Sequence, residues 1–370
     1  MRVLIGTGGT AGHVFPAVAT AMRLRDRIGA EVVFLGRAEG QEAELVPGAG
    51  FALETVAALP FRRALSPALL RAPVAALRAA AACRPLVREA DVVLGMGGYV
   101  SVPVSLAARR ERVPLVLHEQ NAIPGLANRL GARWARVVAL SFLEAGRRLP
   151  RRVRTTLTGN PVRDAVLRVR EDRAGLAEEA RSVLGLEPDR RTAVFLGGSQ
   201  GALRLDRAAV ELCRLLADRS DLQVLVITGP RHHDVVVSHL PRTRGLHVRT
   251  EPFVDRIELV YAAADVAVAR AGASTVAELT VAGVPAILVP YPYATGRHQE
   301  ANARAVERAG GAHVLLDDAA TGGAVADRIL LLLEDPAVLE SMARASLRFG
   351  RADAADALAD VAASVVERTR

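Results

Sequence analysis

The sequence predicts an α/β protein made of two Rossmann-like domains, each a doubly wound parallel sheet. Short runs rich in Val and Leu alternate with longer segments of helical period along all 370 residues, which is typical of strands buried on both faces and linked by helices. A strand-like run followed by a Gly-rich turn opens each half, at residues 3–10 and again at 193–201. Hydrophobic residues make up 51% of the chain, enough to fill more than one core.

The strands are predicted from these Val- and Leu-rich runs. In the first half they are expected at 2–6, 31–36, 91–95, 114–118 and 136–140. In the second half they are expected at 192–197, 223–228, 246–250, 265–269 and 285–289. Segments of helical period, such as 16–28 and 203–218, fill the gaps. Since helical crossovers join parallel strands, each half is expected to form one parallel sheet.

The predicted domain boundary lies near residue 160. An Arg-rich stretch at 163–191, with a turn signal at Pro188 and Asp189, separates the two patterns. We therefore assign residues 1–160 to a first domain and 161–349 to a second. The last segment, 350–370, is expected to be helical and to pack back on the first domain.

The charge balance favours an acidic partner. The 48 basic residues are all Arg and outnumber 40 acidic residues, which gives a formal net charge of +8. Nucleic acid, anionic lipid and phosphorylated ligands fit such a chain, and an Arg-rich solvated surface is the alternative. RNA binding by base stacking is disfavoured, because there are only 8 Phe, 4 Tyr and 1 Trp. The absence of Lys excludes P-loop NTPase and Schiff-base chemistry.

Metal-dependent, redox and membrane-spanning classes have little sequence support. There is no D-x-D, no H-E-x-x-H and no Cys cluster. The adjacent His232 and His233 are expected to be exposed loop residues, and Cys83 and Cys213 to be buried free thiols. No apolar run approaches the ~18 residues of a transmembrane helix, so a soluble or peripheral protein is expected.

The first Gly-rich turn, residues 6–13, reads G-T-G-G-T-A-G-H. Glycines between a strand and a helix let backbone N–H groups approach an anion, although a plain tight turn is the alternative. A dinucleotide site is disfavoured, because the glycine spacing is wrong and the second strand ends at Arg37 rather than an acid. His13 stands at the helix start, where a neutral imidazole is favoured and can act as a general base.

Further polar turns follow other predicted strands. The run Gly95 to Tyr99 and the run His118 to Asn121 end strands of the first half, where open α/β sheets bind ligands. In the second half, residues 197–201 again present N–H groups to an anion, and residues 271–278 form a small-residue turn at the start of a helix. Glu278, expected in the first turn of that helix, can bind a ribose diol or simply pair with the helix dipole.

An amphipathic segment spans residues 61–88. Its arginines, beside an apolar face, suit an interfacial membrane segment, and a core-facing helix with a solvated Arg face is the alternative. The membrane-binding candidates are Arg62, Arg63, Arg71 and Arg78.

Six motifs in order resemble those of the MurG family, the cell-wall glycosyltransferases of family 28. They lie at residues 8–13, 95–99, 118–121, 159–163, 197–201 and 271–278. The resemblance covers essentially the whole chain. It implies a GT-B fold, in which the two Rossmann-like domains face a cleft.

The resemblance also implies a reaction. The donor would be UDP-N-acetylglucosamine (UDP-GlcNAc) and the acceptor lipid I, undecaprenyl-pyrophosphoryl-N-acetylmuramoyl-pentapeptide. GlcNAc would be transferred with inversion to the 4-hydroxyl of N-acetylmuramic acid (MurNAc), giving lipid II for peptidoglycan synthesis, without a cofactor or bound metal. Such an enzyme would work peripherally at the anionic cytoplasmic face of the cell membrane, with no nucleic acid, and other cell-wall enzymes are candidate partners.

The family's site residues carry over onto matching positions of this sequence. His13 would be the base, with Glu119 as the second candidate. Ala11, Ser274 and Ala277 depart from the family's usual residues, but their backbone N–H groups can still serve. The substrate-binding set would be Thr10, Ala11, Gly12, Asn121, Arg163, Ser199, Val254, Ala273, Ser274, Thr275, Val276, Ala277, Glu278 and Gln299.

Two alternatives remain at this point. A UDP-sugar 2-epimerase shares the fold type, but it would need extra carboxylates and no lipid acceptor. A non-enzymatic basic protein that binds lipid or RNA would explain the charge without any chemistry.

Overall fold

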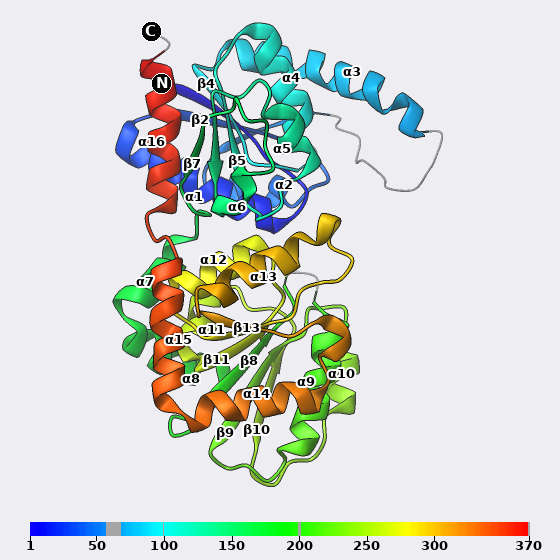
Figure 1. Cartoon of the computed structure of the whole chain (residues 1–370), viewed down its shortest axis with the longest axis vertical. Helices are drawn as coiled ribbons and strands as arrows, with labels where there is room; N and C mark the ends of the chain where they lie inside the picture. Colours follow the sequence, from blue (N-terminus) through cyan, green and yellow to red (C-terminus); the bar gives the residue numbers. More distant parts are fainter. Residues whose placement is uncertain (57–67, 99, 199–200, 369–370) are drawn as a thin grey trace. The chain divides into compact units, whose positions relative to one another are not determined.

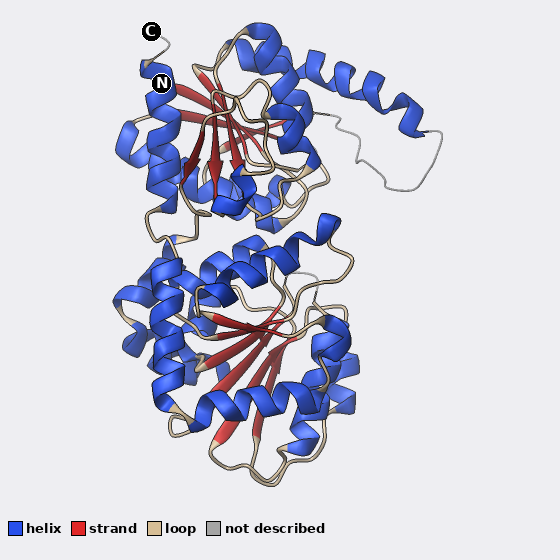
Figure 2. Ribbon diagram, in the orientation of Figure 1, coloured by secondary structure: helices blue, strands red, loops and turns tan. Residues whose placement is uncertain are grey.

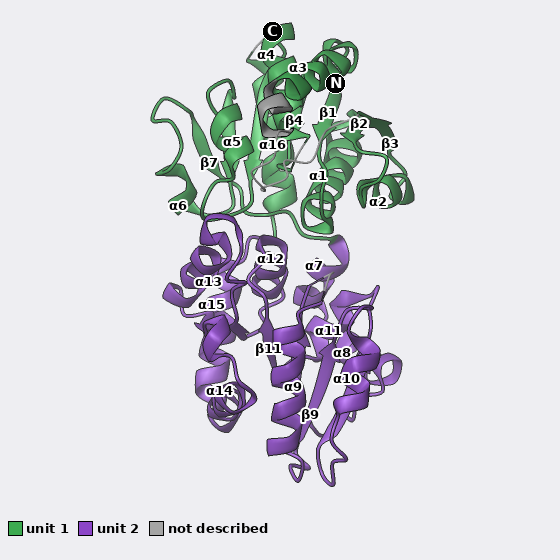
Figure 3. Cartoon of the chain, turned by 90° about the vertical axis from the view of Figure 1, so that its right-hand side faces the viewer, with its two compact units in different colours: residues 1–163, 352–370 green, residues 164–351 purple. Residues whose placement is uncertain are grey.

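The chain folds into two compact units, each with its own parallel sheet (Figures 1 and 2). The computed structural model describes residues 1–56, 68–98, 100–198 and 201–368, without the side chains of residues 68–73. Unit 1 comprises Met1–Arg163 and Ala352–Arg370, and unit 2 comprises Asp164–Arg351 (Figure 3). The predicted α/β class with two doubly wound sheets is confirmed.

The sheet of unit 1 is parallel throughout, in the order β3-β2-β1-β4-β5-β6-β7. The order reverses direction between β1 and β4, and open α/β sheets typically bind ligands at the carboxyl edge beside such a reversal. The strands are β1 (Arg2–Gly6), β2 (Glu31–Gly36), β3 (Ala52–Thr55), β4 (Val92–Gly95), β5 (Leu115–Glu119), β6 (Val137–Leu140) and β7 (Thr155–Leu157).

Helices cover both faces of this sheet, because successive residues of each strand point to opposite sides. In β1, Val3 and Ile5 join the core beneath α1 and α16, whereas Leu4 joins the core beneath α3 and α4. The helices of unit 1 are α1 (Ala11–Ile28), α2 (Glu42–Gly48), α3 (Ala68–Arg88), α4 (Ser101–Glu111), α5 (Leu126–Gly131), α6 (Leu143–Gly146) and α16 (Ala354–Glu367).

The C-terminal helix α16 is part of unit 1. Leu358, Ala359 and Ala362 are buried in the core that β1 and α1 share. At its solvent edge, the Arg27 guanidinium at the end of α1 lies 2.6 Å from the Asp356 carboxylate. The chain therefore leaves unit 1 after Arg163 and returns to it at its end.

Unit 2 repeats the architecture with the strand order β10-β9-β8-β11-β12-β13. Its direction reverses between β8 and β11, and open α/β sheets typically bind ligands beside such a reversal. The strands are β8 (Arg191–Leu196), β9 (Leu222–Ile227), β10 (His247–Glu251), β11 (Val266–Ala269), β12 (Ala286–Leu288) and β13 (Ala312–Val314). The helices are α7 (Asp164–Glu171), α8 (Arg173–Leu184), α9 (Leu203–Leu215), α10 (His233–His239), α11 (Ile257–Ala263), α12 (Ala273–Val281), α13 (His298–Arg308), α14 (Gly322–Glu334) and α15 (Pro336–Phe349), with short 3₁₀ turns at Thr295–Arg297 and Asp317–Ala319.

Three edge strands and several boundaries differ from the prediction. Short β3, β7 and β13 were not predicted, because three or four residues give too little alternation to recognise. The Arg-rich stretch at 163–191 contains α7 and α8, since Val166, Val169 and Leu176 supply a buried face. The first helix begins at Ala11, and Pro16 lies inside it.

Arg112 ends α4 in the left-handed region, with φ 60° and ψ 23°, a conformation that costs an L-residue about 1–2 kcal/mol. Replacing Arg112 with Gly should therefore raise the free energy of unfolding by up to about 1 kcal/mol, after the extra entropy of the unfolded glycine is subtracted. Urea denaturation measures this change. Arg110→Gly, two residues earlier inside α4, is the matched control and should lower stability by about 1 kcal/mol. A loss of stability in Arg112→Gly would contradict the assignment.

Candidate active site

The first Gly-rich turn joins β1 to α1. Thr10 precedes α1 in an extended conformation, and its hydroxyl lies 3.4 Å from the Nδ1 atom of His13. The Thr7 hydroxyl donates to the His13 carbonyl at 3.2 Å. His13 therefore occupies the first turn of α1, half-buried at the carboxyl edge of the sheet, with its ring oriented by Thr10.

The turn after β4 packs directly against this first turn. Gly97 and Gly98 both have positive φ, 91° and 75°, a region that glycine adopts without strain. A Cβ atom on Gly97 would lie 2.9 Å from the His13 ring, and one on Gly98 would collide with the carbonyl oxygen of Gly8. The two Gly-rich turns are therefore in backbone contact, and His13 lies over the second of them. Tyr99 lies outside the described residues.

A buried carboxylate that the sequence did not reveal supports the first turn. Glu42, at the start of α2, accepts hydrogen bonds from the N–H groups of Arg37 at 3.0 Å and Gly9 at 3.4 Å. A Cβ atom on Gly8 would lie 2.6 Å from its Oε1 atom, and the neighbouring Gln41 accepts from the N–H of Ala11. In a segment with several other charged residues, Glu42 resembles an ordinary surface acid. The nearby Gly36 and Gly40 are the one local hint of close packing.

Glu119, the second candidate for the base, is fully engaged by its own loop. Only 2% of the residue is exposed. Its carboxylate accepts hydrogen bonds from the N–H of Asn121 at 2.9 Å, the N–H of Gly125 at 3.0 Å and the side-chain amide of Asn128 at 2.8 Å. Burial raises the pKa of Glu119, and these hydrogen bonds oppose that rise. The geometry is that of a carboxylate that fixes the loop carrying Asn121.

His118 links β5 to the turn after β7. It is buried, and its Nε2 atom lies 2.9 Å from the Gly159 carbonyl, so a neutral ring donates there. Burial, together with the nearby His13, lowers the pKa of His118 to about 4, although the hydrogen bond to the Gly159 carbonyl opposes this shift. The same turn leads to Arg163, whose guanidinium stacks 4.3 Å from the ring centre of Phe15 in α1. His13, Asn121 and Arg163 thus belong to one edge of unit 1.

The candidate site of unit 2 includes the Gly-rich turn that follows β8. Ser199 lies outside the described residues, but Gly197, Gly198 and Gly201 are placed. A Cβ atom on Gly201 would collide with the Thr228 carbonyl and lie 3.1 Å from the Nδ1 atom of His232. Here the turn after β9 packs on the turn after β8, as the turns after β4 and β1 do in unit 1.

The expectation that His232 and His233 are exposed loop residues is wrong. Both are partly buried, because the turn after β9 folds against the Gly-rich turn. His232 Nδ1 lies 3.2 Å from the buried Asp206 carboxylate, and His233 Nδ1 lies 3.2 Å from the Thr228 hydroxyl.

The small-residue turn after β11 leads into α12, which begins at Ala273. Glu278 is therefore in the second turn of the helix, and its expected place in the first turn is wrong. It is buried, and the Tyr261 hydroxyl donates to its Oε2 atom at 2.8 Å. Pairing with the helix dipole is therefore a less well supported role for Glu278, since the effect of the dipole on side chains fades beyond the first turn. Ser274, Thr275 and Ala277 are half-buried, and Ala273 and Val276 are buried.

The remaining predicted site residues are dispersed. Gln299, in the first turn of α13, accepts a hydrogen bond from the Tyr291 N–H at 2.9 Å. Val254 is half-buried in the loop after β10. Of the membrane candidates, Arg78 is exposed on α3. Arg71 is in the same helix without a described side chain, and Arg62 and Arg63 lie outside the described residues.

Comparisons with known proteins identify the family. Models of the N-terminal and C-terminal domains of glycosyltransferase family 28 match residues 3–140 and 192–358. A UDP-N-acetylglucosamine–N-acetylmuramyl-(pentapeptide) pyrophosphoryl-undecaprenol N-acetylglucosamine transferase of Moorella thermoacetica is 41% identical, over 99% of this chain and 100% of the relative. The chain belongs to glycosyltransferase family 28. The predicted family is confirmed.

Solved structures that resemble this chain include one from this family and others that share its fold. The MurG crystal structure from Acinetobacter baumannii has a TM-score of 0.78 and 27% identity, covering 98% of this chain and 99% of that one. A UDP-GlcNAc 2-epimerase from Neisseria meningitidis has a TM-score of 0.69 at 12% identity, covering 98% and 100%. The epimerase likeness shows the fold alone.

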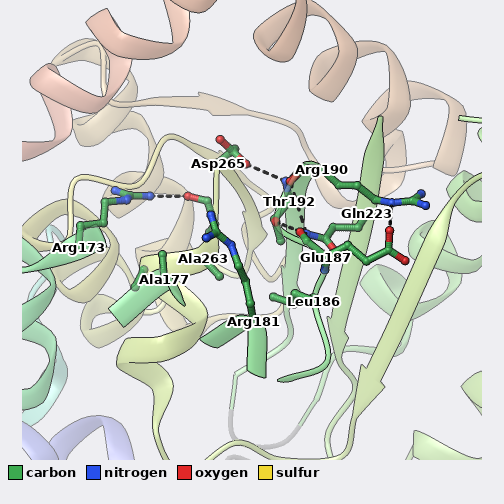
Figure 4. A pocket seen from close by; sticks show the side chains of 12 residues that line it. Arg173, Ala177, Arg181, Leu186, Glu187, Arg190, Thr192, Gln223, Ala263 and Asp265 are labelled. Carbon is green, nitrogen blue, oxygen red and sulfur yellow. Dashed lines mark hydrogen bonds and ion pairs between the residues drawn. The ribbon is translucent and has the colours of Figure 1, made fainter. Parts of the chain in front are cut away.

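A pocket of about 140 Å³ lies elsewhere in this family 28 chain, near the amino ends of the unit 2 strands (Figure 4). Its wall includes Arg173, Thr192, Gln223 and Asp265. Arg173 donates to the carbonyls of Ala264, Tyr261 and Ala282, so its charge is used inside the fold. Ligand sites of open α/β sheets lie at the opposite, carboxyl edge.

Metal and membrane-spanning features are not found in the described part of the chain. Its His, Cys, Asp and Glu residues form no group of three that could hold a metal ion. None of its helices is long and apolar enough to cross a membrane.

The buried neutral His118 should make unit 1 sensitive to acid. The folded-state pKa of about 4 lies below the usual 6.5, so between these values the unfolded chain binds one more proton. The contribution of His118 to stability should therefore be constant above about pH 6.5 and fall by about 1.4 kcal/mol per pH unit between about pH 6.5 and 4. Urea denaturation at several pH values measures the slope. In His118→Gln the slope should decrease by that amount, and an unchanged slope would contradict the assignment.

Proposed function

We propose that this glycosyltransferase moves GlcNAc from UDP-GlcNAc to the 4-hydroxyl of MurNAc in undecaprenyl-pyrophosphoryl-MurNAc-pentapeptide, converting lipid I to lipid II. The observation that carries the proposal is the 41% identity, over the full length, to a relative whose name specifies this transfer. The geometry supports it, since each unit presents a Gly-rich turn, packed against a neighbouring turn, at the carboxyl edge of its sheet. An epimerase is less well supported, because that likeness extends to the fold alone.

His13 is the proposed general base. The acceptor 4-hydroxyl gives its proton to the imidazole while its oxygen bonds to the anomeric carbon of GlcNAc. The bond from that carbon to the diphosphate oxygen breaks on the opposite side, so the configuration inverts and UDP leaves. The contact with the Thr10 hydroxyl at 3.4 Å and the glycine surface of Gly97 orient the ring for this role.

Glu119 is a positioning residue in this proposal. Its two oxygens already accept three hydrogen bonds, and freeing one would leave a buried N–H group unpaired. Its function is to hold Asn121 and the loop up to Asn128 in place. Glu42 does the same for the first Gly-rich turn.

Unit 2 is proposed to bind most of the donor. Backbone N–H groups of the turn at 197–201 and at the start of α12 would neutralise the diphosphate and the charge of the leaving UDP. Glu278, held by Tyr261, would bind the ribose hydroxyls, Val254 the uracil, and Gln299 the GlcNAc. From unit 1, Thr10, Ala11, Gly12, Asn121 and Arg163 complete the proposed substrate-binding set.

Helices α3 and α5 of unit 1 are the proposed membrane-binding surface. Leu126 on α5 is 63% exposed, and Leu77 on α3 is 57% exposed. Arg78 and Arg129 are exposed on the same two helices. Exposed leucines beside arginines suit insertion into an anionic interface, where the polyprenyl tail of the acceptor resides. We place the enzyme peripherally at the cytoplasmic face.

The reaction is tested by following UDP release from UDP-GlcNAc with and without a soluble lipid I analogue. The proposal expects release only with the analogue, together with a disaccharide product. A 2-epimerase would convert the sugar without an acceptor, and a non-enzymatic binder would release nothing. Either of those results would overturn the proposal.

Replacing His13 with Ala should lower kcat by roughly 10²–10⁴, the usual contribution of a general base. UDP-GlcNAc affinity, measured by calorimetry, should change little, because the base contacts the acceptor hydroxyl. His239→Ala, an exposed histidine on α10, is the control and should keep full activity. Near-normal kcat in His13→Ala would remove His13 from the base role.

Replacing Glu278 with Gln should weaken UDP-GlcNAc binding by about 10- to 100-fold, the range for hydrogen bonds to a charged group. The wild type should prefer UDP to its 2′-deoxyuridine analogue, and the variant should lose that preference. Calorimetric titration with both nucleotides checks this. If the variant still discriminates fully, Glu278 does not bind the ribose.

Changing both Arg78 and Arg129 to Glu should weaken binding to anionic vesicles by at least about 10-fold, since each arginine near the surface contributes about 1 kcal/mol. The matched control reverses Arg207 and Arg348, two exposed arginines of unit 2, and should bind as the wild type does. Vesicle sedimentation measures both. Equal loss in the two variants would mean that net charge, rather than this surface, governs binding.

A further inference from the structure

A histidine–carboxylate pair borders the Gly-rich turn of unit 2. Asp206, in the first turn of α9, is 1% exposed, and its Oδ2 atom lies 3.2 Å from the Nδ1 atom of His232. The imidazole lies against Gly201, whose added Cβ would be 3.1 Å from Nδ1. The His232 side chain is 28% exposed. Its Nε2 atom has no hydrogen-bond partner among the described residues.

The other charged and titratable groups near the pair are engaged with other partners, so His232 is the side chain that can interact with a ligand. Arg270, at the end of β11, favours the ionised form of Asp206, but its guanidinium is already paired with Asp317 and with two carbonyls. Arg204 donates to the carbonyls of Asp317 and Asp318. His233 contacts the Thr228 hydroxyl rather than the carboxylate.

We propose that His232, held by Asp206, binds the diphosphate of the donor as an imidazolium and makes donor affinity depend on pH. The Nδ1–H group donates to Asp206, and this fixes the ring beside the glycines. A proton on Nε2 then provides a charged donor beside the Gly-rich turn, and charge-assisted hydrogen bonds to phosphate are among the stronger ones. The inference rests on the proposed function, because the anion is taken to be the diphosphate of UDP-GlcNAc.

The sign of the pH dependence follows from linkage. If the imidazolium binds the diphosphate better than the neutral ring does, donor binding takes up a proton, and affinity falls as pH rises. An ionised Asp206 favours the imidazolium. Burial raises the pKa of Asp206 to about 6, so its carboxylate is ionised at neutral pH, where it can act in this way.

The test is calorimetric titration with UDP-GlcNAc between about pH 5.5 and 8.5, a range in which the diphosphate diester of this ligand keeps a constant charge. The wild type should bind about 5- to 10-fold more weakly at the upper end. His232→Gln should bind weakly at every pH, with no slope. Asp206→Asn should shift the fall in affinity to lower pH, since the imidazolium loses its counter-charge.

The matched control is His247→Gln. His247 also pairs with a carboxylate, Glu187 at 3.3 Å, but it begins β10 at the opposite edge of the sheet. This variant should keep the wild-type profile. Circular dichroism melts establish that each variant is folded. Gln should be tolerated at position 232, because the His232 side chain is partly exposed.

Two results would overturn the inference. If folded His232→Gln keeps the wild-type affinity and slope, His232 does not bind the diphosphate, while donor binding and the proposed function stand. If the wild type itself does not bind UDP-GlcNAc at any pH, the proposed function fails together with this inference.

Discussion

The backbone contact between Gly8 and Gly98 is the constraint on which the edge of unit 1 depends. Any side chain on Gly98 would meet the carbonyl oxygen of Gly8, a main-chain atom that cannot move without displacing the whole turn. This contact brings the turns after β1 and β4 together at the point where the strand order reverses. It also places the glycine surface against which the His13 ring lies. The position of the proposed base is therefore set by main-chain packing.

Buried carboxylates hold this arrangement in place. The carboxylates of Glu42 and Glu119 both accept hydrogen bonds from backbone N–H groups of irregular loops. Without these partners the N–H groups would be unpaired and costly to bury. An acid near a reaction centre suggests proton transfer, but an acid whose oxygens are fully bonded serves better as a scaffold. Glu119 therefore serves as a scaffold. His13 is instead half-buried and is oriented through its Nδ1 atom by Thr10, as a proton acceptor would be.

Much of the fold was predictable from the sequence because β1, β2 and the central strands of unit 2 contain apolar runs, and glycines end β1 and β2 and follow β8. The edge strands β3, β7 and β13 were not, since they are short and only partly buried.

In the site, the Gly-rich turns and His13 were found through strand-to-turn spacing. Glu42, the pairing of Asp206 with His232, and the engagement of Glu119 depend on contacts between segments distant in sequence. Spacing along one chain does not encode such contacts.

The most direct measurement is the turnover of Gly98→Ala with UDP-GlcNAc and a soluble lipid I analogue, alongside its affinity for UDP. The added methyl group should separate the two turns of unit 1 and lower kcat by at least about 10²-fold, the lower range for a displaced general base. UDP affinity should stay close to that of the wild type, because unit 2 supplies the proposed diphosphate and uridine contacts. A folded Gly98→Ala enzyme with normal turnover would contradict the dependence of the reaction on this contact.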